Sequence, residues 1–187
     1  MARLTKSEAQ VILDTFFDEV DKARKYLSRN IQDGDHRRER LGVMAGEMMR
    51  PRTPIDFATW LASAIGEALG AEAGITMVHE GTWRILGEWK KPQALLGSSL
   101  YRRAESGDLS EITEEPIQSP SGETPALVHL GVPIFGEHAL VAIVLLDTVY
   151  SVTQAERELV LAMMGTVGVL LEQGLQLQSV SQNENNV

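Results

Sequence analysis

The sequence contains an uninterrupted apolar run, ALVAIVLL, from Ala139 to Leu146. Val141, Ile143 and Val144 are β-branched, and β-branched residues pack well in strands. Successive side chains of a strand point to opposite faces of its sheet, so the run predicts a strand that is buried on both faces. We therefore expect a sheet that is covered on both sides.

The segment before this strand is also apolar, LVHLGVPIF from Leu127 to Phe135, and predicts a second strand. Residues 136–138, Gly-Glu-His, combine a flexible backbone with polar side chains, as a hairpin turn requires. Pro133 has no N–H to donate to a neighbouring strand, so we expect it to face an unpaired edge or an irregularity. The two runs therefore predict an antiparallel hairpin.

A long helix is expected after the hairpin, over Thr153–Gln178. Thr153 and Glu156 have the spacing of a capping box, in which each side chain accepts a hydrogen bond from the other residue's amide. Apolar residues follow at helical spacing. About 25 helical residues span roughly 37 Å, whereas a typical strand spans roughly 20 Å. Part of the helix should extend past the sheet and need another helix as cover.

Three helices are predicted in the first part of the chain, over Thr5–Ser28, His36–Arg50 and Ile55–Leu69. The first is amphipathic and either packs on its own domain or forms a dimer; the sequence leaves both interpretations open. The third has Thr53 as its N-cap with Pro54 at the first helical position, and Gly70 follows its end.

Basic residues gather around the second helix: His36, Arg37, Arg38, Arg40, Arg50 and Arg52. A nucleic-acid surface is one interpretation. A solvated helix face is favoured, because no aromatic residues lie among them and the chain carries a net charge of −9.

The middle of the chain predicts a further hairpin, Gly74–His79 with Thr82–Trp89, around Glu80-Gly81. A short helix (Gln93–Ser106) and a short strand (Leu109–Thr113) follow. The segment EEPIQSPSGETP that ends at Pro125 is rich in proline and polar residues and predicts an exposed loop that acts as a lid. Helices at the ends and antiparallel strands between them indicate an α+β fold.

No catalytic or metal-binding constellation is found. The chain has no Cys, which excludes disulfides, thiolate metal sites and catalytic thiols. Its four His are scattered, the serines lack a nucleophile-elbow context, and Glu111, Glu114 and Glu115 suit a solvated acidic loop better than an acid–base pair. The chain opens without a signal-peptide pattern, and no uncharged stretch approaches the length of a membrane span. We expect a cytoplasmic protein, not an enzyme, that binds neither membranes nor nucleic acid directly.

From about His36 to Gln178 the chain resembles a GAF domain. The resembling pieces, in order, are ALGAEAGITMVHEG, RRAESGDLSEIT, LVHLGVPIF, VAIVLLD and VTQAERELVLAMMGTVGVLLEQ. The resemblance implies a GAF-like central antiparallel sheet of five to six strands, with the long N- and C-terminal helices on one face. On the other face, a short helix and loops close over a ligand pocket. The expected organisation is an N-terminal dimerisation helix (1–34), a GAF-like domain (35–178) and a disordered tail (179–187).

The chain departs from three functional groups of the family. The N-K…F…D-E signature of the cyclic-nucleotide-binding members is missing. Bilin-carrying members use a Cys and the free-methionine-sulfoxide reductases of this fold use several, whereas this chain has none. These departures argue against those activities and leave any cofactor unidentified.

For a ligand pocket we expect eight residues from the sheet face away from the long helices and from the segment that covers it: Met77, Trp83, Leu96, Leu100, Tyr101, Arg103, Ile112 and His129. These residues could instead simply fill that face. His129 is interpreted as a hydrogen-bonded structural residue, with a ligand-contacting or haem-axial His as the alternative.

The function we expect is non-enzymatic and regulatory. A small molecule would bind in the pocket and signal to a partner protein through a homodimer formed by the Thr5–Ser28 and Thr153–Gln178 helices. The alternative is a ligandless scaffold that acts through protein–protein contacts.

Overall fold

The protein is built around a five-stranded antiparallel sheet with the strand order β2-β1-β5-β4-β3. In this computed structural model the described residues are 34–48, 50, 52–117, 128–148 and 150–184. Two units divide the chain, Met1–His36 and Arg37–Val187, and the sheet belongs to the second. The predicted Thr5–Ser28 helix, residues 118–125 of the predicted lid, residues 126–127 and residues 185–187 lie outside the described residues.

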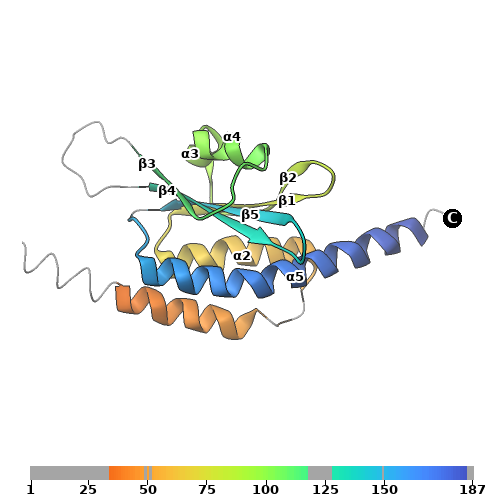
Figure 1. Cartoon of the computed structure of the whole chain (residues 1–187), viewed down its shortest axis with the longest axis horizontal. Helices are drawn as coiled ribbons and strands as arrows, with labels where there is room; N and C mark the ends of the chain where they lie inside the picture. Colours follow the sequence, from red (N-terminus) through yellow and green to blue (C-terminus); the bar gives the residue numbers. More distant parts are fainter. Residues whose placement is uncertain (1–33, 49, 51, 118–127, 149, 185–187) are drawn as a thin grey trace, which may run out of the picture. The chain divides into compact units, whose positions relative to one another are not determined.

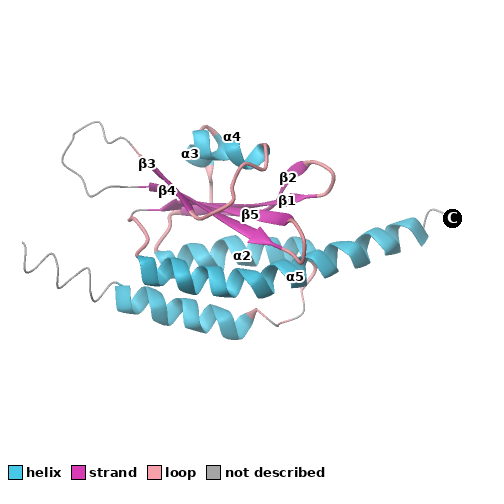
Figure 2. Cartoon of the chain, viewed as in Figure 1, coloured by secondary structure: helices cyan, strands magenta, loops and turns pink. Residues whose placement is uncertain are grey.

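The helices and strands follow the predicted order along the chain, with two short helices where one is predicted. The strands are β1 (Ala73–His79), β2 (Trp83–Trp89), β3 (Thr113–Pro116), β4 (Val128–Phe135) and β5 (Leu140–Thr148), and the helices are a helix over residues 34–47, α2 (Pro54–Leu69), α3 (Gln93–Leu96), α4 (Ser99–Glu105) and α5 (Gln154–Glu184). The 34–47 helix from residue 37 onward, α2 and α5 lie on one side of the sheet, and α3 and α4 lie on the other (Figure 1). Figure 2 shows the strands in magenta between the helices of the two sides. The α+β architecture, with a central antiparallel sheet of five strands, is therefore confirmed.

The middle of β5 is buried on both faces, as its apolar run predicts. Ala142, Val144 and Leu146 belong to a large cluster with the three helices of one face. Ile143 and Leu145 belong to a smaller cluster under α3 and α4. All five residues are 0% exposed.

The caps predicted for α2 are present. The Thr53 hydroxyl accepts a hydrogen bond from the Asp56 N–H at 3.2 Å, and Pro54 occupies the first helical position. Gly70 ends the helix with φ 74°, a left-handed conformation that glycine adopts without a steric penalty.

The capping box of α5 is also present and has a third member. The Thr153 N–H donates to Glu156 Oε2 at 2.7 Å, and the Glu156 N–H donates to Thr153 Oγ at 3.3 Å. The other carboxylate oxygen of Glu156 lies 3.3 Å from Nε of Arg37, and the two side chains are 0% and 14% exposed. This buried ion pair joins the 34–47 helix to the first turn of α5.

Pro133 lies where the sequence predicts. β3 pairs with β4 only from Val128 to Gly131, so Pro133 is in the part of β4 that extends past the end of β3. Its missing N–H therefore leaves no gap in the hydrogen bonding to β3.

Four predicted details in this unit were wrong. The predicted strand Leu109–Thr113 is shifted, because Leu109 and Ile112 are buried in a loop, in different clusters. The strand begins at Thr113 and continues through the predicted loop, because Glu114 and Glu115 find polar partners. The predicted helix Gln93–Ser106 is two helices, since the Ser98 side chain caps α4 by accepting from the Tyr101 N–H. The helix expected to end at Gln178 continues to Glu184, and residues 179–184 contain no Gly or Pro that would end it earlier.

The packing of α5 predicts a large difference between two of its glycines. A methyl group at the buried Gly168 would overlap the main-chain carbonyl of Phe135, whereas at Gly165, less than one turn earlier, it would meet nothing within 4 Å. We expect Gly168→Ala to lower the free energy of unfolding by about 1–3 kcal/mol through overpacking. Gly165→Ala should raise it by up to about 1 kcal/mol through helix propensity. Urea denaturation checks both variants; equal stabilities would contradict the close contact.

The buried Arg37–Glu156 pair predicts that substitutions of these two residues have strongly non-additive effects on the free energy of unfolding. Glu156→Ala removes an N-cap contact and leaves Arg37 buried without its counter-charge, so it should cost about 3–5 kcal/mol of folding free energy. Adding Arg37→Met should recover part of that loss, because no unpaired charge then remains. Glu158→Ala, on the exposed side of the same turn, is the control and should change stability by less than about 0.5 kcal/mol. If the stability losses of the two single variants simply add in the double variant, the ion pair contributes nothing to the free energy of unfolding.

Candidate functional site

The face of the sheet under α3 and α4 is closely packed. The covering segment packs on the sheet through eight side chains that are each between 0 and 1% exposed. Leu95, Leu100, Ala104 and Leu109 come from the covering segment, and Ile75, Met77, Ile143 and Leu145 come from the sheet. Gly131 allows this approach, since a methyl group there would lie 3.2 Å from a Leu100 methyl. The described side chains therefore fill the space that the resemblance assigns to a ligand.

The structure brings five of the eight predicted pocket residues together. Met77 and Leu100 are in the cluster beneath α4, and Trp83 and Tyr101 pack against its margin. His129 lies on the same face, 8% exposed.

The other three predicted residues lie apart from that group. Ile112 packs with the cluster on the opposite face. Leu96 is 42% exposed, and the Arg103 side chain is 46% exposed beside Asp108. These three residues therefore do not line the space beneath α4.

A row of polar side chains crosses three strands at one end of this face. Glu115 on β3 lies directly opposite His129 on β4, and His129 lies opposite Asp147 on β5. Directly opposed residues of antiparallel strands project from the same face. His129 Nδ1 is 3.4 Å from an Asp147 carboxylate oxygen, and this buried nitrogen has no hydrogen bond within the described part of the chain. The hydrogen bond predicted for a structural His129 is therefore not made through Nδ1.

Glu115 connects this row to the start of α4. Its carboxylate accepts hydrogen bonds from the Ser99 hydroxyl and, at 2.8 Å, from the Leu100 N–H. Burial raises the pKa of Glu115, but these hydrogen bonds and the nearby His129 outweigh it and hold the pKa below its ordinary value. Glu114, which points to the other face, accepts from the Val152 N–H at 3.0 Å and pairs with Arg157. The two carboxylates thus have structural partners and form no acid–base pair.

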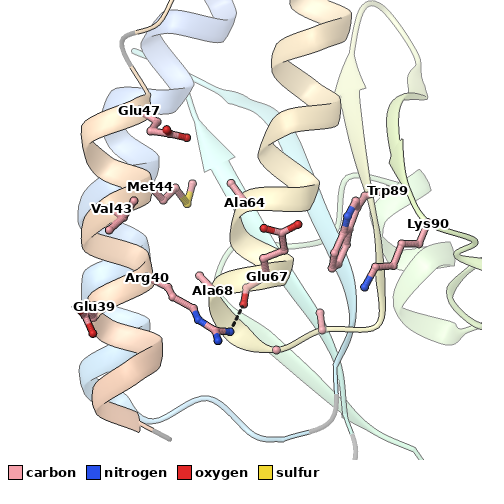
Figure 3. A pocket seen from close by; sticks show the side chains of 12 residues that line it. Glu39, Arg40, Val43, Met44, Glu47, Ala64, Glu67, Ala68, Trp89 and Lys90 are labelled. Atoms are coloured by element: carbon pink, nitrogen blue, oxygen red, sulfur yellow. Dashed lines mark hydrogen bonds between the residues drawn. The ribbon is translucent and has the colours of Figure 1, made fainter.

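A trough of about 750 Å³ lies on the helix side of the domain. It is lined by residues 39–47, 64–71 and 89–90, which come from the 34–47 helix, the end of α2 and the end of β2. Figure 3 shows Arg40 extending across it, where its guanidinium donates to the main-chain carbonyl of Glu67 at 3.0 Å. At the far side the Lys90 ammonium lies 4.1 Å from the centre of the Trp89 ring. No sequence pattern identified this trough, because its walls are distant in the chain.

The basic residues predicted as one solvated face are partly engaged in the structure. Arg37 pairs with Glu156, Arg40 reaches Glu67, and the Arg52 guanidinium lies 4.2 Å from the centre of the Trp60 ring. Arg50 and Arg52 also border a smaller hollow of about 180 Å³ between α2 and α5. Among the described residues, no group of three or more His, Asp and Glu side chains could hold a metal ion.

No family model matches the chain, and no curated protein matches its sequence. Solved structures do match the fold. The GAF domain of a protein described as a sensor histidine kinase, from Pseudomonas syringae pv. tomato, is 13% identical with a TM-score of 0.57, and the match covers 87% of this chain and 99% of that domain. The GAF domain of an Acinetobacter phosphoenolpyruvate-protein phosphotransferase is 11% identical with a TM-score of 0.54, covering 74% and 93%.

A third match is an enzyme. The free methionine-R-sulfoxide reductase of Neisseria meningitidis, solved with its substrate, is 9% identical with a TM-score of 0.52, covering 78% of this chain and 93% of that one. At these identities the likeness shows the fold alone. The chain therefore has a GAF-like fold, a fold that regulatory domains and an enzyme share.

The Glu115 contact predicts an acid-dependent loss of stability. Because the pKa of Glu115 is lowered by folding, its ionised form stabilises the native state above the ordinary value of 4.5, and this stabilisation is lost as the pH falls through the lowered pKa. Glu115→Gln should therefore lose less stability than the natural protein between pH 5 and about pH 3. Glu111→Gln, an exposed control outside this contact, should keep the natural acid dependence. Thermal midpoints of the three proteins measured between pH 5 and about pH 3 test the prediction. An identical dependence of the midpoint on pH in all three would contradict it.

Proposed function

We propose that this chain is a non-enzymatic sensory or regulatory protein that passes a small-molecule signal to a partner through a helical dimer. The observation that carries the proposal is the likeness to the GAF domain of a sensor histidine kinase over 99% of that domain, with a TM-score of 0.57. The absence of Cys from the chain supports the non-enzymatic part, since the resemblance implies that the reductases of this fold use cysteines. A cytoplasmic location is part of the same proposal.

In this proposal the ligand binds between α4 and the sheet, near Met77, Trp83, Leu100, Tyr101 and His129. Because this face is packed, a ligand can enter only if α4 moves outward, so it would select a more open state. The row of Glu115, His129 and Asp147 would then offer one donor or acceptor nitrogen and two carboxylates. A small polar or cationic molecule suits such a row.

The dimer in this proposal uses α5 and the Thr5–Ser28 helix of each copy. Between Glu158 and Glu172, α5 carries no charged residue, and Leu161 is 47% exposed on its outer side. The stretch Gln154–Leu177 even has the length and mean hydropathy (1.4) of a membrane span, with 33% of its most apolar window buried. Its other side packs into the core through Val160, Met163, Met164 and Val167, as in a core helix of a folded domain. A second copy would cover the rest of this apolar surface.

A ligandless scaffold is the second candidate. The specific observation in its favour is the close packing beneath α4, where eight side chains are between 0 and 1% exposed. In that case the protein would act through its surfaces alone.

A ligand screen separates the two candidates. A molecule that binds only the folded state at about 100 times its Kd adds about 2.7 kcal/mol to the free energy of unfolding, which corresponds to roughly 5–10 °C in Tm for a chain of this size. We expect at least one member of a metabolite library to produce such a shift, and Leu100→Trp, which puts a bulkier side chain where the ligand would enter once α4 has moved outward, to abolish it. A library without any hit would favour the scaffold.

The dimer has its own test. Leu161→Lys places a charge on the uncharged outer side of α5 and should convert the dimer to a monomer, as should deletion of residues 1–30. Ile55→Lys, at another apolar residue that is 53% exposed, is the control and should leave the dimer intact. Light scattering after gel filtration measures the mass. A dimer that survives both changes would contradict the proposed interface.

A further inference from the structure

The trough has the shape of a seat for a helix. Its floor is the second half of α2, where Ala64 and Ala68 present small side chains, and its walls are the 34–47 helix and the end of β2 (Figure 3). Small residues between larger walls allow the backbone of another helix to approach closely. Val43 on one wall is 64% exposed, so an apolar side chain stands at the margin without cover from the described residues.

Of the carboxylates that line the trough, those of Glu67 and Glu47 are the ones that a cationic partner would meet. Glu67 projects from α2 and is exposed, and within the described part of the chain its carboxylate has no hydrogen bond or ion pair. Glu47 lies on the opposite wall, 3.2 Å from the largely exposed Arg50, a surface pair of small energetic value. The two basic residues of the trough are used internally, Arg40 by the carbonyl of Glu67 and Lys90 by the ring of Trp89.

Lys90 shows which chemical group the site accepts. It is the only non-glycine residue of the described ranges with a positive φ, 58°, a conformation that costs energy for a residue with a Cβ. This backbone turn comes directly after Trp89, and the Lys90 ammonium lies over the indole. An alkylammonium on the face of a tryptophan is a favourable cation–π pair, so the chain's own side chain occupies the place that a partner's lysine or arginine would take.

We propose that this trough binds an amphipathic helix of a partner protein, one that carries lysine or arginine beside its apolar stripe. The apolar stripe would lie on Ala64, Met44 and Val43, and the cations would meet Glu67 and Glu47. Helix-in-groove recognition of this kind uses apolar anchors for affinity and charge complementarity for specificity. The trough would bind the partner to which the proposed regulatory protein passes its signal. Its biological meaning therefore rests on the proposed function, whereas the binding itself does not.

The probe is a fluorescein-labelled synthetic peptide of leucine and lysine, of about 18 residues so that it can form a helix. It is titrated with the full chain and binding is followed by fluorescence anisotropy. Glu67→Lys and Val43→Asp should each raise the Kd by about tenfold or more, because one removes a charge contact and the other an apolar contact. A peptide with glutamate in place of every lysine should not bind.

Two matched controls separate the trough from the general acidity of the chain. Glu111→Lys makes the same charge change in an exposed loop, and Ile55→Asp makes the same apolar-to-acid change at the start of α2. Both should keep the Kd of the natural chain within about threefold. Circular dichroism confirms that all four variants are folded.

Three results would overturn the proposal. The first is a Glu67→Lys variant that weakens binding no more than Glu111→Lys does. The second is a glutamate peptide that binds as tightly as the lysine peptide. The third is a change in the mass of the protein in light scattering for Glu67→Lys and Val43→Asp, which would make a second copy the occupant. No small molecule is present in this assay. A failed ligand screen therefore leaves the result intact, and failure of the peptide to bind leaves the ligand and dimer proposals untouched.

Discussion

The structure depends on burying both faces of one strand. β5 is the middle strand of the sheet, and its residues from Ala142 to Leu146 have no polar side chain on either face. Apolar surface in this amount is stable only when each face has its own cover. The chain meets this requirement by placing its long helices on one side and a short pair of helices on the other. Every other element pairs with β5, extends the sheet or covers it.

The two covers are held in different ways. On the helix side, contacts are extensive and include the buried Arg37–Glu156 pair and the approach of α5 to Phe135. On the other side, α4 is a short helix whose first turn is held by Glu115 on an edge strand. Regions with fewer buried contacts open more easily than the main core. The α4 side is therefore the side on which a ligand could change the structure at low cost.

Much of the fold could be predicted because its signals are local. Thr53 and Gly70 determine where α2 begins and ends, and Thr153 with Glu156 determines where α5 begins. The hairpin of β1 and β2 is predicted by its two strand-forming runs and the Glu80-Gly81 turn between them, which need no information from elsewhere in the chain. β3 was misplaced because the partners of Glu114 and Glu115 lie far away in the sequence, at Val152, Arg157 and the start of α4. The trough was missed for the same reason, since Arg40, Glu67 and Trp89 meet only after the chain has folded.

The contact of Gly168 with the Phe135 carbonyl has a mechanical consequence for α5. Its neighbours Val167 and Val169 carry branched side chains. A screw movement by one residue, roughly 1.5 Å along the axis with a turn of about 100°, would therefore drive a branched side chain into the main chain of β4. Tilting about this point is the motion that remains. From Gly168 to the last helical residue, Glu184, the helix measures roughly 24 Å. Over that length, a tilt of α5 by about 10° at Gly168 displaces the end of the helix by roughly 4 Å.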